Sequence, residues 1–431
     1  RVRLPTALAA LAYRDFRLLW AGQFVDMLGT QVQTVALGWL VYSLTGSTAA
    51  LGGVGPARAI PTILLSIFGG TLADQVDRRR VLLVSQSFLA GLSALLALII
   101  SLGKANVPIL YAFAALTAAA AAFDSPTRQA LIPSLVPRER LPNALTLNVL
   151  AWETAAVLGP ATGGVIIKVF GVSMAYWINA ASFLAVLSAI VAMRTRAPVP
   201  AGPRRGWSAV VEGLEFVRGR AILWQLMLVD FLAVLFVSSM GLLPAFARDV
   251  LAVGSEGLGL LYSAPAAGAV AGSLIFALLP SPRRPGRVVA LAVAAYGISL
   301  ALFGMARSFP MALGLLALAG GLDAVSMAMR HTVRQLATPD SLRGRVGALA
   351  SVFSAGGPRL GEFQAGMVAS VVGARYAMVL GGSACLLMVV TSRWWARQLW
   401  QYRGEELPEG HGGVSDEVEV PGAAESSVAR A

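Results

Sequence analysis

The chain has 431 residues, of which 57% are hydrophobic and only 13% charged, and its formal net charge is +12. In soluble domains about a quarter of the residues are charged. Because the charged fraction here is about half of that and the mean hydropathy is +0.71, a water-soluble fold is excluded. The single cysteine, Cys385, excludes a disulfide framework and a thiolate metal site, and the presence of only two histidines argues against a histidine metal centre. We therefore expect a membrane protein without a bound cofactor.

A spanning helix needs about 20 mostly apolar residues, and windows of that size predict twelve spans. The segments are continuous and rich in Ala, Leu and Gly, without the two-residue alternation of barrel strands. We therefore predict an all-α membrane protein. The spans of the first half are roughly 16–42, 50–73, 81–102, 107–126, 144–168 and 173–193, and those of the second half are roughly 222–247, 257–279, 286–305, 309–330, 344–370 and 374–396.

The positions of the basic residues test this count. Twelve spans put both termini on one side, and the termini and loops of that side hold 27 of the 34 Lys and Arg residues. The opposite loops hold five, and the remaining two, Arg58 and Arg359, lie within spans. Because basic residues in short loops mark the cytoplasmic side, we predict that both termini are cytoplasmic. In this arrangement Arg128, which follows the fourth predicted span, and Arg330, at the end of the tenth, are counted with cytoplasmic loops.

The two halves of the chain resemble each other at a shift of about 204 residues. Asp26 then falls on Asp230, and the Arg79-Arg80 pair falls on Arg283-Arg284. Close to the same shift, "LGPATGG" at 158–164 meets "LGEFQAG" at 360–366. Two parallel six-helix halves are typical of one large transporter class. We predict two pseudo-symmetric six-helix bundles.

The predicted bundles leave two polar segments between and after them. The first bundle covers 1–193 and the second covers 221–400. Between them, 194–220 is a cytoplasmic linker that begins rich in Pro and Gly and ends in an amphipathic helix around Leu214 and Phe216. The acidic tail, 401–431, is expected to be disordered.

The loop after the second span carries the motif "GGTLADQVDRRR". It resembles the loop signature of the major facilitator superfamily, with matches at Gly70, Leu72, Ala73, Asp74, Arg78 and Arg79 and with Asp77 in place of the usual glycine. The segment 125–148 resembles the subgroup that includes the enterobactin exporter and macrolide efflux pumps. The resemblance implies that Asp74, Asp77 and the arginines Arg78, Arg79 and Arg80 belong to a cytoplasmic gate, with Asp74, Arg78 and Arg79 latching the two halves through adjacent carboxylates. An ordinary solvated turn that anchors the topology is the alternative.

A second motif lies in the fifth span, where "GPATGG" resembles the signature associated with antiporters. Pro160, which follows Gly159, removes a backbone donor and bends the helix, while Gly163 and Gly164 allow close helix contact. Packing alone explains these residues as well as a role in substrate handling does.

Ionisable residues within predicted spans form the third group of candidates. Each costs about 3 kcal/mol mid-membrane on insertion scales, so it should face an aqueous cavity or a partner. The superfamily fold places spans one, four, seven and ten around a central cavity, which implies that Asp26, Asp230 and Asp323 face it. Ion pairs between helices, for example with Arg58 or Arg359, are the alternative. The candidates for cavity contact or proton coupling are Asp26, Asp230, Asp323, Glu153, Arg58, Arg359, Glu362 and Asp124.

These features predict a secondary transporter of the bacterial cytoplasmic membrane that is not an enzyme. We expect a monomer that exports a hydrophobic or amphipathic small molecule, a drug or siderophore, in exchange for protons. A cavity lined by a few acids would suit cationic or neutral amphiphiles. No phosphate-binding loop for ATP is present, and the charge is expected to face lipid rather than nucleic acid. Uptake of a metabolite stays open, and an intramembrane enzyme or a receptor is a more distant alternative.

Overall fold

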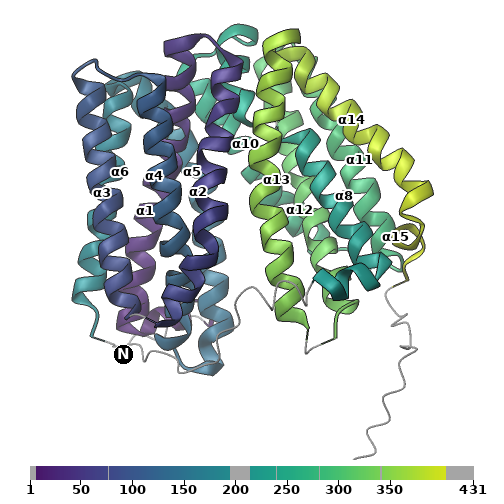
Figure 1. Cartoon of the computed structure of the whole chain (residues 1–431), viewed down its shortest axis with the longest axis horizontal. Helices are drawn as coiled ribbons and strands as arrows, with labels where there is room; N and C mark the ends of the chain where they lie inside the picture. Colours follow the sequence, from purple (N-terminus) through teal and green to yellow (C-terminus); the bar gives the residue numbers. More distant parts are fainter. Residues whose placement is uncertain are drawn as a thin grey trace, which may run out of the picture.

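The computed structural model describes residues 6–75, 77–194, 214–238, 240–280, 282–339 and 342–403, and every regular element in these ranges is a helix (Figure 1). The first half contributes six long helices, at the left of Figure 1. They are α1 (Arg14–Thr45), α2 (Thr48–Gln75), α3 (Arg78–Ser101), α4 (Val107–Leu131), α5 (Leu141–Phe170) and α6 (Val172–Ala192), with short turns η1 (Thr6–Ala12), η2 (Ile132–Ser134) and η3 (Arg138–Arg140).

The second half repeats this arrangement at the right of Figure 1. Its long helices are α8 (Ala221–Val237), α10 (Gly254–Ala277), α11 (Pro285–Gly304), α12 (Phe309–Leu336), α13 (Arg343–Val372) and α14 (Ala374–Trp395), with the short elements η4 (Met240–Leu242), α9 (Leu243–Ala245), η5 (Phe246–Val250) and α15 (Arg397–Gln401). Packing follows the same scheme in both bundles: α2 lies on α4 and α3 on α6, as α10 lies on α12 and α11 on α14.

Nine of the described helical segments are long and apolar enough to cross a membrane. The helices α1, α2 and α13 are as long as these and lie among them. Together they complete the twelve spans and the two pseudo-symmetric six-helix bundles that the sequence predicts. Polar residues of these three helices, among them Gln31, Arg58 and Arg359, line the cavity between the bundles.

Two predicted span ends are wrong, because the helices run farther than their apolar windows. The fourth helix ends at Leu131 and the tenth at Leu336, so Arg128 and Arg330 belong to helices rather than to loops. Both arginines are largely buried, with side chains 14% and 11% exposed. A hydropathy window ends where charged and polar residues accumulate, whereas a helix continues while its charges find partners inside the bundle.

The seventh span was predicted as one segment, 222–247, but it is interrupted. Helix α8 ends at Val237, and the chain resumes as the short turns η4, α9 and η5. Gly241 and Pro244 explain the break, because glycine disfavours helix and proline removes a backbone donor. The interruption exposes Met240 and Gly241 to the space between the two bundles.

The first and last described elements, η1 and α15, lie toward the same end of the molecule as the arginine cluster at the start of α3 (Figure 1). We call this the arginine-rich end and the other the arginine-poor end. At the arginine-rich end, residues 214–219 form a short helix in which Val217 is buried against the second bundle. The rest of the predicted linker, 195–213, and the predicted tail beyond residue 403 lie outside the described residues. Those domain boundaries therefore stay predictions.

Candidate functional site

The two bundles meet along two seams in the arginine-poor half, and the first joins α5 to α10. Gly164 lies so close to α10 that an added Cβ would be 2.4 Å from the Ser255 carbonyl oxygen. Gly259 approaches the Pro160 carbonyl equally closely, at 2.3 Å from an added Cβ. The Ser255 hydroxyl also donates to the Gly164 carbonyl at 3.1 Å. Small residues thus let the two backbones touch, as in other close membrane helix pairs.

The fifth-span motif serves a second contact on the opposite side of α5. Added Cβ atoms at Gly159 and Gly163 would be 2.5 Å from the Gln31 Cβ and 3.0 Å from the Val32 Cα of α1. The motif therefore packs α5 against α1 within its own bundle and against α10 of the other bundle at once. This placement confirms the close helix contact predicted for Gly163 and Gly164.

The second seam joins α2 to α13 and is related to the first by the internal repeat. Gly52 and Gly366 face each other, with an added Cβ at Gly366 only 2.5 Å from the Gly52 Cα. One turn farther along α2, an added Cβ at Gly55 would be 2.4 Å from the Arg359 carbonyl oxygen. Both seams are therefore built from facing small residues.

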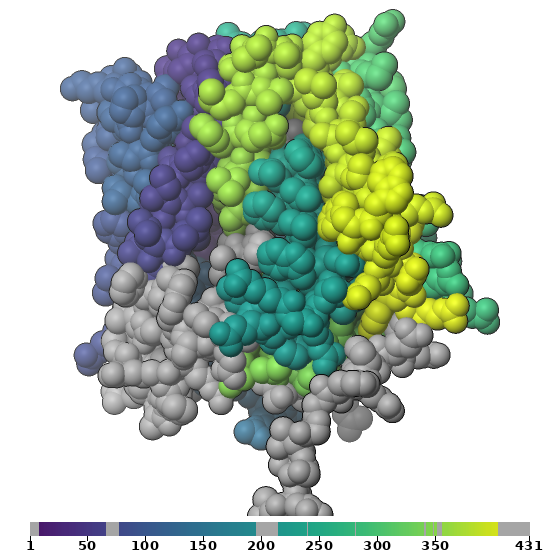
Figure 2. Space-filling model, turned by 45° about the vertical axis from the view of Figure 1, so that its right-hand side comes forward, coloured from purple at the N-terminus to yellow at the C-terminus, as the bar shows by residue number. Residues whose placement is uncertain are grey.

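Polar pairs add to the seams at the arginine-poor end. Tyr42 of α1 donates a hydrogen bond to Asp249 of η5, and Lys168 of α5 forms a 2.5 Å ion pair with Glu256 of α10. Figure 2, from a turned view, shows the two bundles in continuous contact at this end. The arginine-poor end is closed in this conformation.

Below the seams the bundles enclose a cavity of about 780 Å³. Residues from both halves line it, and its wall is a mixture of apolar, amide, hydroxyl and charged side chains. The first half supplies, among others, Thr30, Gln31, Gln33, Thr34, Leu37, Val54, Arg58, Thr62, Thr117, Ser125, Gln129, Trp152, Asn179 and Phe183. The second half supplies Met240, Gly241, Tyr262, Arg359 and Glu362.

The charges of this cavity differ from those expected. Arg58, Arg359 and Glu362 line it, whereas the predicted cavity acids Asp26, Asp230 and Asp323 are not among its lining residues. Among the described residues, two arginines against one glutamate make the lining net basic. The expectation that aspartates line the cavity and suit it to cationic or neutral amphiphiles is therefore wrong for Asp26, Asp230 and Asp323, because arginines hold them inside each bundle.

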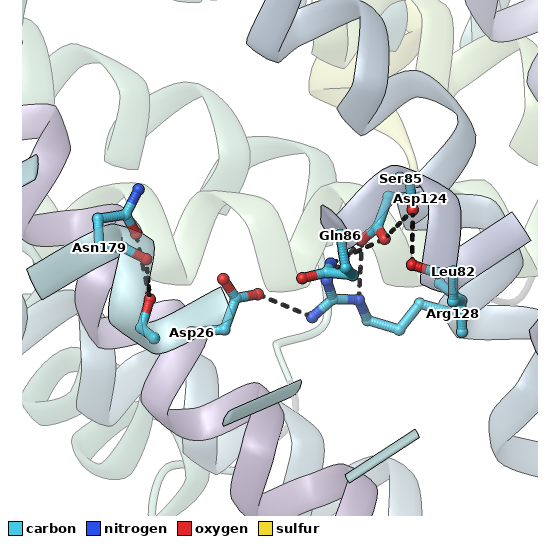
Figure 3. A network of polar contacts seen from close by, with 8 residues as sticks. Asp26, Leu82, Ser85, Gln86, Asp124, Arg128 and Asn179 are labelled. Carbon is cyan, nitrogen blue, oxygen red and sulfur yellow. Dashed lines mark hydrogen bonds and ion pairs between the residues drawn. The ribbon is translucent and has the colours of Figure 1, made fainter. Parts of the chain in front are cut away.

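The first of these bundle networks surrounds Arg128 (Figure 3). Arg128 donates through Nη1 to Asp26 of α1 at 3.1 Å and through Nε to Asp124, one turn earlier in α4, at 3.0 Å. Asp124 also accepts hydrogen bonds of 2.8 Å from Ser85 and Gln86 of α3. The network ties together α1, α3 and α4.

The second network repeats this plan in the other half. Arg330 of α12 forms an ion pair with Asp230 of α8, and its Nη2 lies 3.4 Å from Asp323. Asp323 also faces a small cavity of about 90 Å³ beside Tyr296. Asp26 and Asp230 are equivalent in the two halves, so each half fastens its first helix to its fourth through an arginine. The alternative partners suggested from sequence, Arg58 and Arg359, are wrong for these aspartates.

Each network contains two carboxylates for one bound arginine. Around Arg128 the donors are unequally shared: Asp124 receives four hydrogen bonds, and Asp26 receives one. The second oxygen of Asp26, Oδ1, is buried without a hydrogen-bond partner in the described residues. A proton on that oxygen would neutralise the surplus negative charge, since a buried charge without compensation is costly.

Sequence reasoning missed the two arginines that organise these networks. Because they are basic, sequence reasoning interprets them as topology anchors. Their spacing from aspartates in the same helix nevertheless indicates partners. Arg128 lies four residues after Asp124 and Arg330 seven after Asp323, so each pair shares one helix face. The remaining candidate, Glu153 of α5, is half-buried and borders none of the cavities described here.

The loop motif after α2 acts within the first bundle in this conformation. Arg78 donates to the Ala130 carbonyl of α4 at 2.9 Å, and Arg79 donates to the Val191 carbonyl of α6 at 2.8 Å. Asp77 caps α3 by accepting from the Arg79 backbone N–H at 2.9 Å, and the exposed Arg80 lies 3.9 Å from Asp77. Arg78 and Arg79 therefore complete exposed helix ends in this conformation, and the arginine–carboxylate bridges expected when the arginine-rich end is shut stay a prediction.

The side-chain surroundings of Gly70 and Asp74 lie outside the described part of the chain. The latch between halves concerns a conformation closed at the arginine-rich end and stays a prediction.

Comparison with known proteins matches this architecture to one family. The family model described as "Transmembrane secretion effector" matches residues 5–407. The chain belongs to this family of the major facilitator superfamily. It is therefore a transporter rather than an enzyme, and the superfamily resemblance read from its motifs is confirmed.

Curated relatives lie in the subgroup that the segment 125–148 resembles. The chain is 25% identical over 386 residues to proteins named enterobactin exporter EntS from Shigella boydii serotype 18 and from Escherichia coli O157:H7. Each match covers 88% of this chain and 92% of the relative.

Solved structures share the fold at low sequence identity. A bacterial homologue of the human lysosomal transporter Spinster, in an inward-facing and unoccupied conformation, matches with a TM-score of 0.71 and 15% identity, covering 92% of this chain and 98% of the other. A bacterial homologue of the iron transporter ferroportin, also inward-facing, matches with a TM-score of 0.68 and 18% identity over 89% and 98%.

Proposed function

We propose that the transmembrane secretion effector family member described here exports an amphipathic small molecule by alternating access. The observation that carries this proposal is the 780 Å³ cavity that both bundles line beneath their closed seams. A space of this size between two pseudo-symmetric bundles is where secondary transporters bind substrate. The relatives named enterobactin exporter favour a siderophore or another amphiphile as substrate and export as the direction.

The arginine distribution supports an orientation for this cycle. The arginine-rich end is assigned to the cytoplasm of a bacterial cell, with both termini inside. The closed arginine-poor end then faces outward, and the cavity lies beneath the external seal. In this arrangement the protein is ready to receive substrate from the cytoplasm or the inner leaflet, as an exporter must be. It acts as a monomer, because one chain forms the whole cavity.

We further propose that protons drive the export through the paired aspartate networks. Each network holds two carboxylates around one arginine, and Asp26 keeps a buried oxygen without a donor. Proton binding there would remove the surplus charge and weaken the attachment of α1 to Arg128. Such a change alters how the first helix is held against the fourth, which is a movement that alternating access requires.

The substitutions Asp26→Asn and Asp230→Asn test this coupling. In proteoliposomes with an imposed pH gradient, each is expected to lower gradient-driven transport by about tenfold or more, because asparagine cannot bind and release a proton. Exchange of labelled for unlabelled substrate without a gradient should continue, since it needs no proton cycle. The substrate is first chosen by screening toxic compounds and siderophores on an expression strain.

The controls separate coupling from folding and from other functions. Glu139→Gln, at an exposed acid in η3, should leave both transport modes unchanged. Full gradient-driven transport by both aspartate variants at equal abundance would refute the coupling role. Movement in the opposite direction would instead make the protein an importer, and transport that is indifferent to the gradient would refute proton coupling.

A further inference from the structure

The guanidinium group of Arg58 lies in the cavity, and the transport cycle proposed above gives it no role. Arg58 lies ten residues from the start of α2, about 15 Å along the helix, and so near the middle of the membrane. It lines the cavity, and no described residue forms a hydrogen bond or an ion pair with its side chain. Its charge interacts electrostatically with Arg359 and Glu362 of α13. A buried arginine without a partner is costly in a membrane and marks a functional position.

Arg359 is only loosely held. Its one ion pair in the described residues joins Nη1 to Glu362 at 3.6 Å, within the same helix. Glu362 is thus the single anion opposite two cations, and the cluster keeps a surplus positive charge. In a cavity of low polarity, this surplus attracts an anion more strongly than it would in water.

The internal repeat shows that seam closure does not require these charges. At the repeat shift, Arg58 corresponds to Tyr262, Arg359 to Val157 and Glu362 to Pro160. The twin seam between α5 and α10 closes with these uncharged residues and the same facing glycines. The two arginines therefore add a chemical property to one side of the cavity that the helix packing does not need.

We propose that Arg58 and Arg359 form a subsite for an acidic group of the transported molecule. This inference rests on the proposed export function and specifies its substrate class: an amphiphile with an apolar body and an anionic oxygen head, such as a carboxylate. Arginine suits this task because its planar fork binds two oxygens at once. Glu362 is the internal competitor that holds Arg359 while the subsite is empty.

The remaining cavity wall fits the other parts of such a molecule. Trp152 and Phe183 of the first half and Met240 of the second provide aromatic and apolar surface. Gln31 and Gln129 add hydrogen-bonding amides without charge. The cavity wall therefore offers complementary surface to an aromatic body as well as to its acidic end.

The test compares three probes with one aromatic body and different charge. Naphthalene-2-carboxylate, naphthalene-2-carboxamide and 2-naphthylmethylammonium are titrated calorimetrically into the full chain in lipid nanodiscs. The wild type should bind the carboxylate about tenfold more tightly than the amide, and the ammonium least. Equal affinity for carboxylate and amide in the wild type would overturn the proposal without any variant.

Substitutions then assign the preference to the named residues. Arg58→Gln and Arg359→Gln should each reduce carboxylate affinity about tenfold while leaving amide affinity unchanged, and Arg58→Lys should restore part of it. Glu362→Gln should strengthen carboxylate binding, because it removes the competing anion. Arg307→Gln, at an exposed arginine in the loop before α12, makes the same change in net charge and should have no effect.

The opposite signs expected for Arg58→Gln and Glu362→Gln make misfolding a poor explanation of the full pattern. Carboxylate selectivity that survives Arg58→Gln and Arg359→Gln would contradict the subsite. Transport is measured separately: selective binding without gradient-driven transport would leave the subsite intact and refute the export function. Transport of all three probes at equal rates would support export and refute the carboxylate subsite.

Discussion

Replacing Arg128 with methionine is expected to destabilise the first bundle by about 3–5 kcal/mol, because it leaves two buried carboxylates without a cation. Asp26 and Asp124 lie on α1 and α4, and both side chains are only 7% exposed. The loss is measured as a shift in the unfolding transition of the purified protein in mixed detergent micelles. Arg138→Gln, at an exposed arginine in η3, should unfold like the wild type.

A combined variant distinguishes the electrostatic cause from a loss of packing. In Arg128→Met combined with Asp26→Asn and Asp124→Asn, no buried charge is left unpaired, so most of the lost stability should return. A triple variant as unstable as Arg128→Met alone would show that the arginine stem, rather than its charge, stabilises the bundle.

Replacing Gly164 with valine is expected to prevent closure of the arginine-poor end and to reduce transport by more than about tenfold. The first added carbon would lie 2.4 Å from the Ser255 carbonyl oxygen of the opposite bundle, a backbone atom that cannot move alone. Alternating access requires this seam to close once in each cycle. The bundles should therefore remain apart at this end.

Distances between spin labels at Lys104 and Arg307 measure this opening. Both residues are exposed, in the loops after α3 and α11, and Cys385→Ala removes the native thiol. The mean distance should increase in Gly164→Val and in the matched seam variant Gly259→Val. Gly91→Val in α3, where an added carbon meets nothing within 4 Å, is the control, and an increase there equal to that of Gly164→Val would contradict the steric cause.

The fold was largely predictable because the membrane restricts it to a few solutions. A bilayer core requires long apolar helices, and the distribution of arginines predicts which helix ends face the cytoplasm. The predicted windows begin and end within a few residues of the observed helices for most of the chain. They failed at Arg128 and Arg330, where polar and charged residues lower the mean hydropathy although the helix continues.

The candidate site was predictable in its members more than in its geometry. The sequence singled out Asp26, Asp230, Arg58, Arg359 and Glu362 as charges too costly to be incidental. It could not assign partners, because those lie 102 residues apart for Asp26 and Arg128 and 100 apart for Asp230 and Arg330. Pairing at such distances is set by how the helices rotate against one another.

The sequence by itself determined the membrane class, the twelve spans, the twofold repeat and the set of buried charges, since each follows from local composition or from comparison of the two halves. Only the tertiary structure decided which charges face the cavity and which neutralise one another. The physical reason is that a buried charge is stabilised by whatever group lies within a few ångströms, and that group comes from another helix. The aspartates form ion pairs with arginines of their own bundles, so the described charges that line the cavity are Arg58, Arg359 and Glu362, and this lining is net basic.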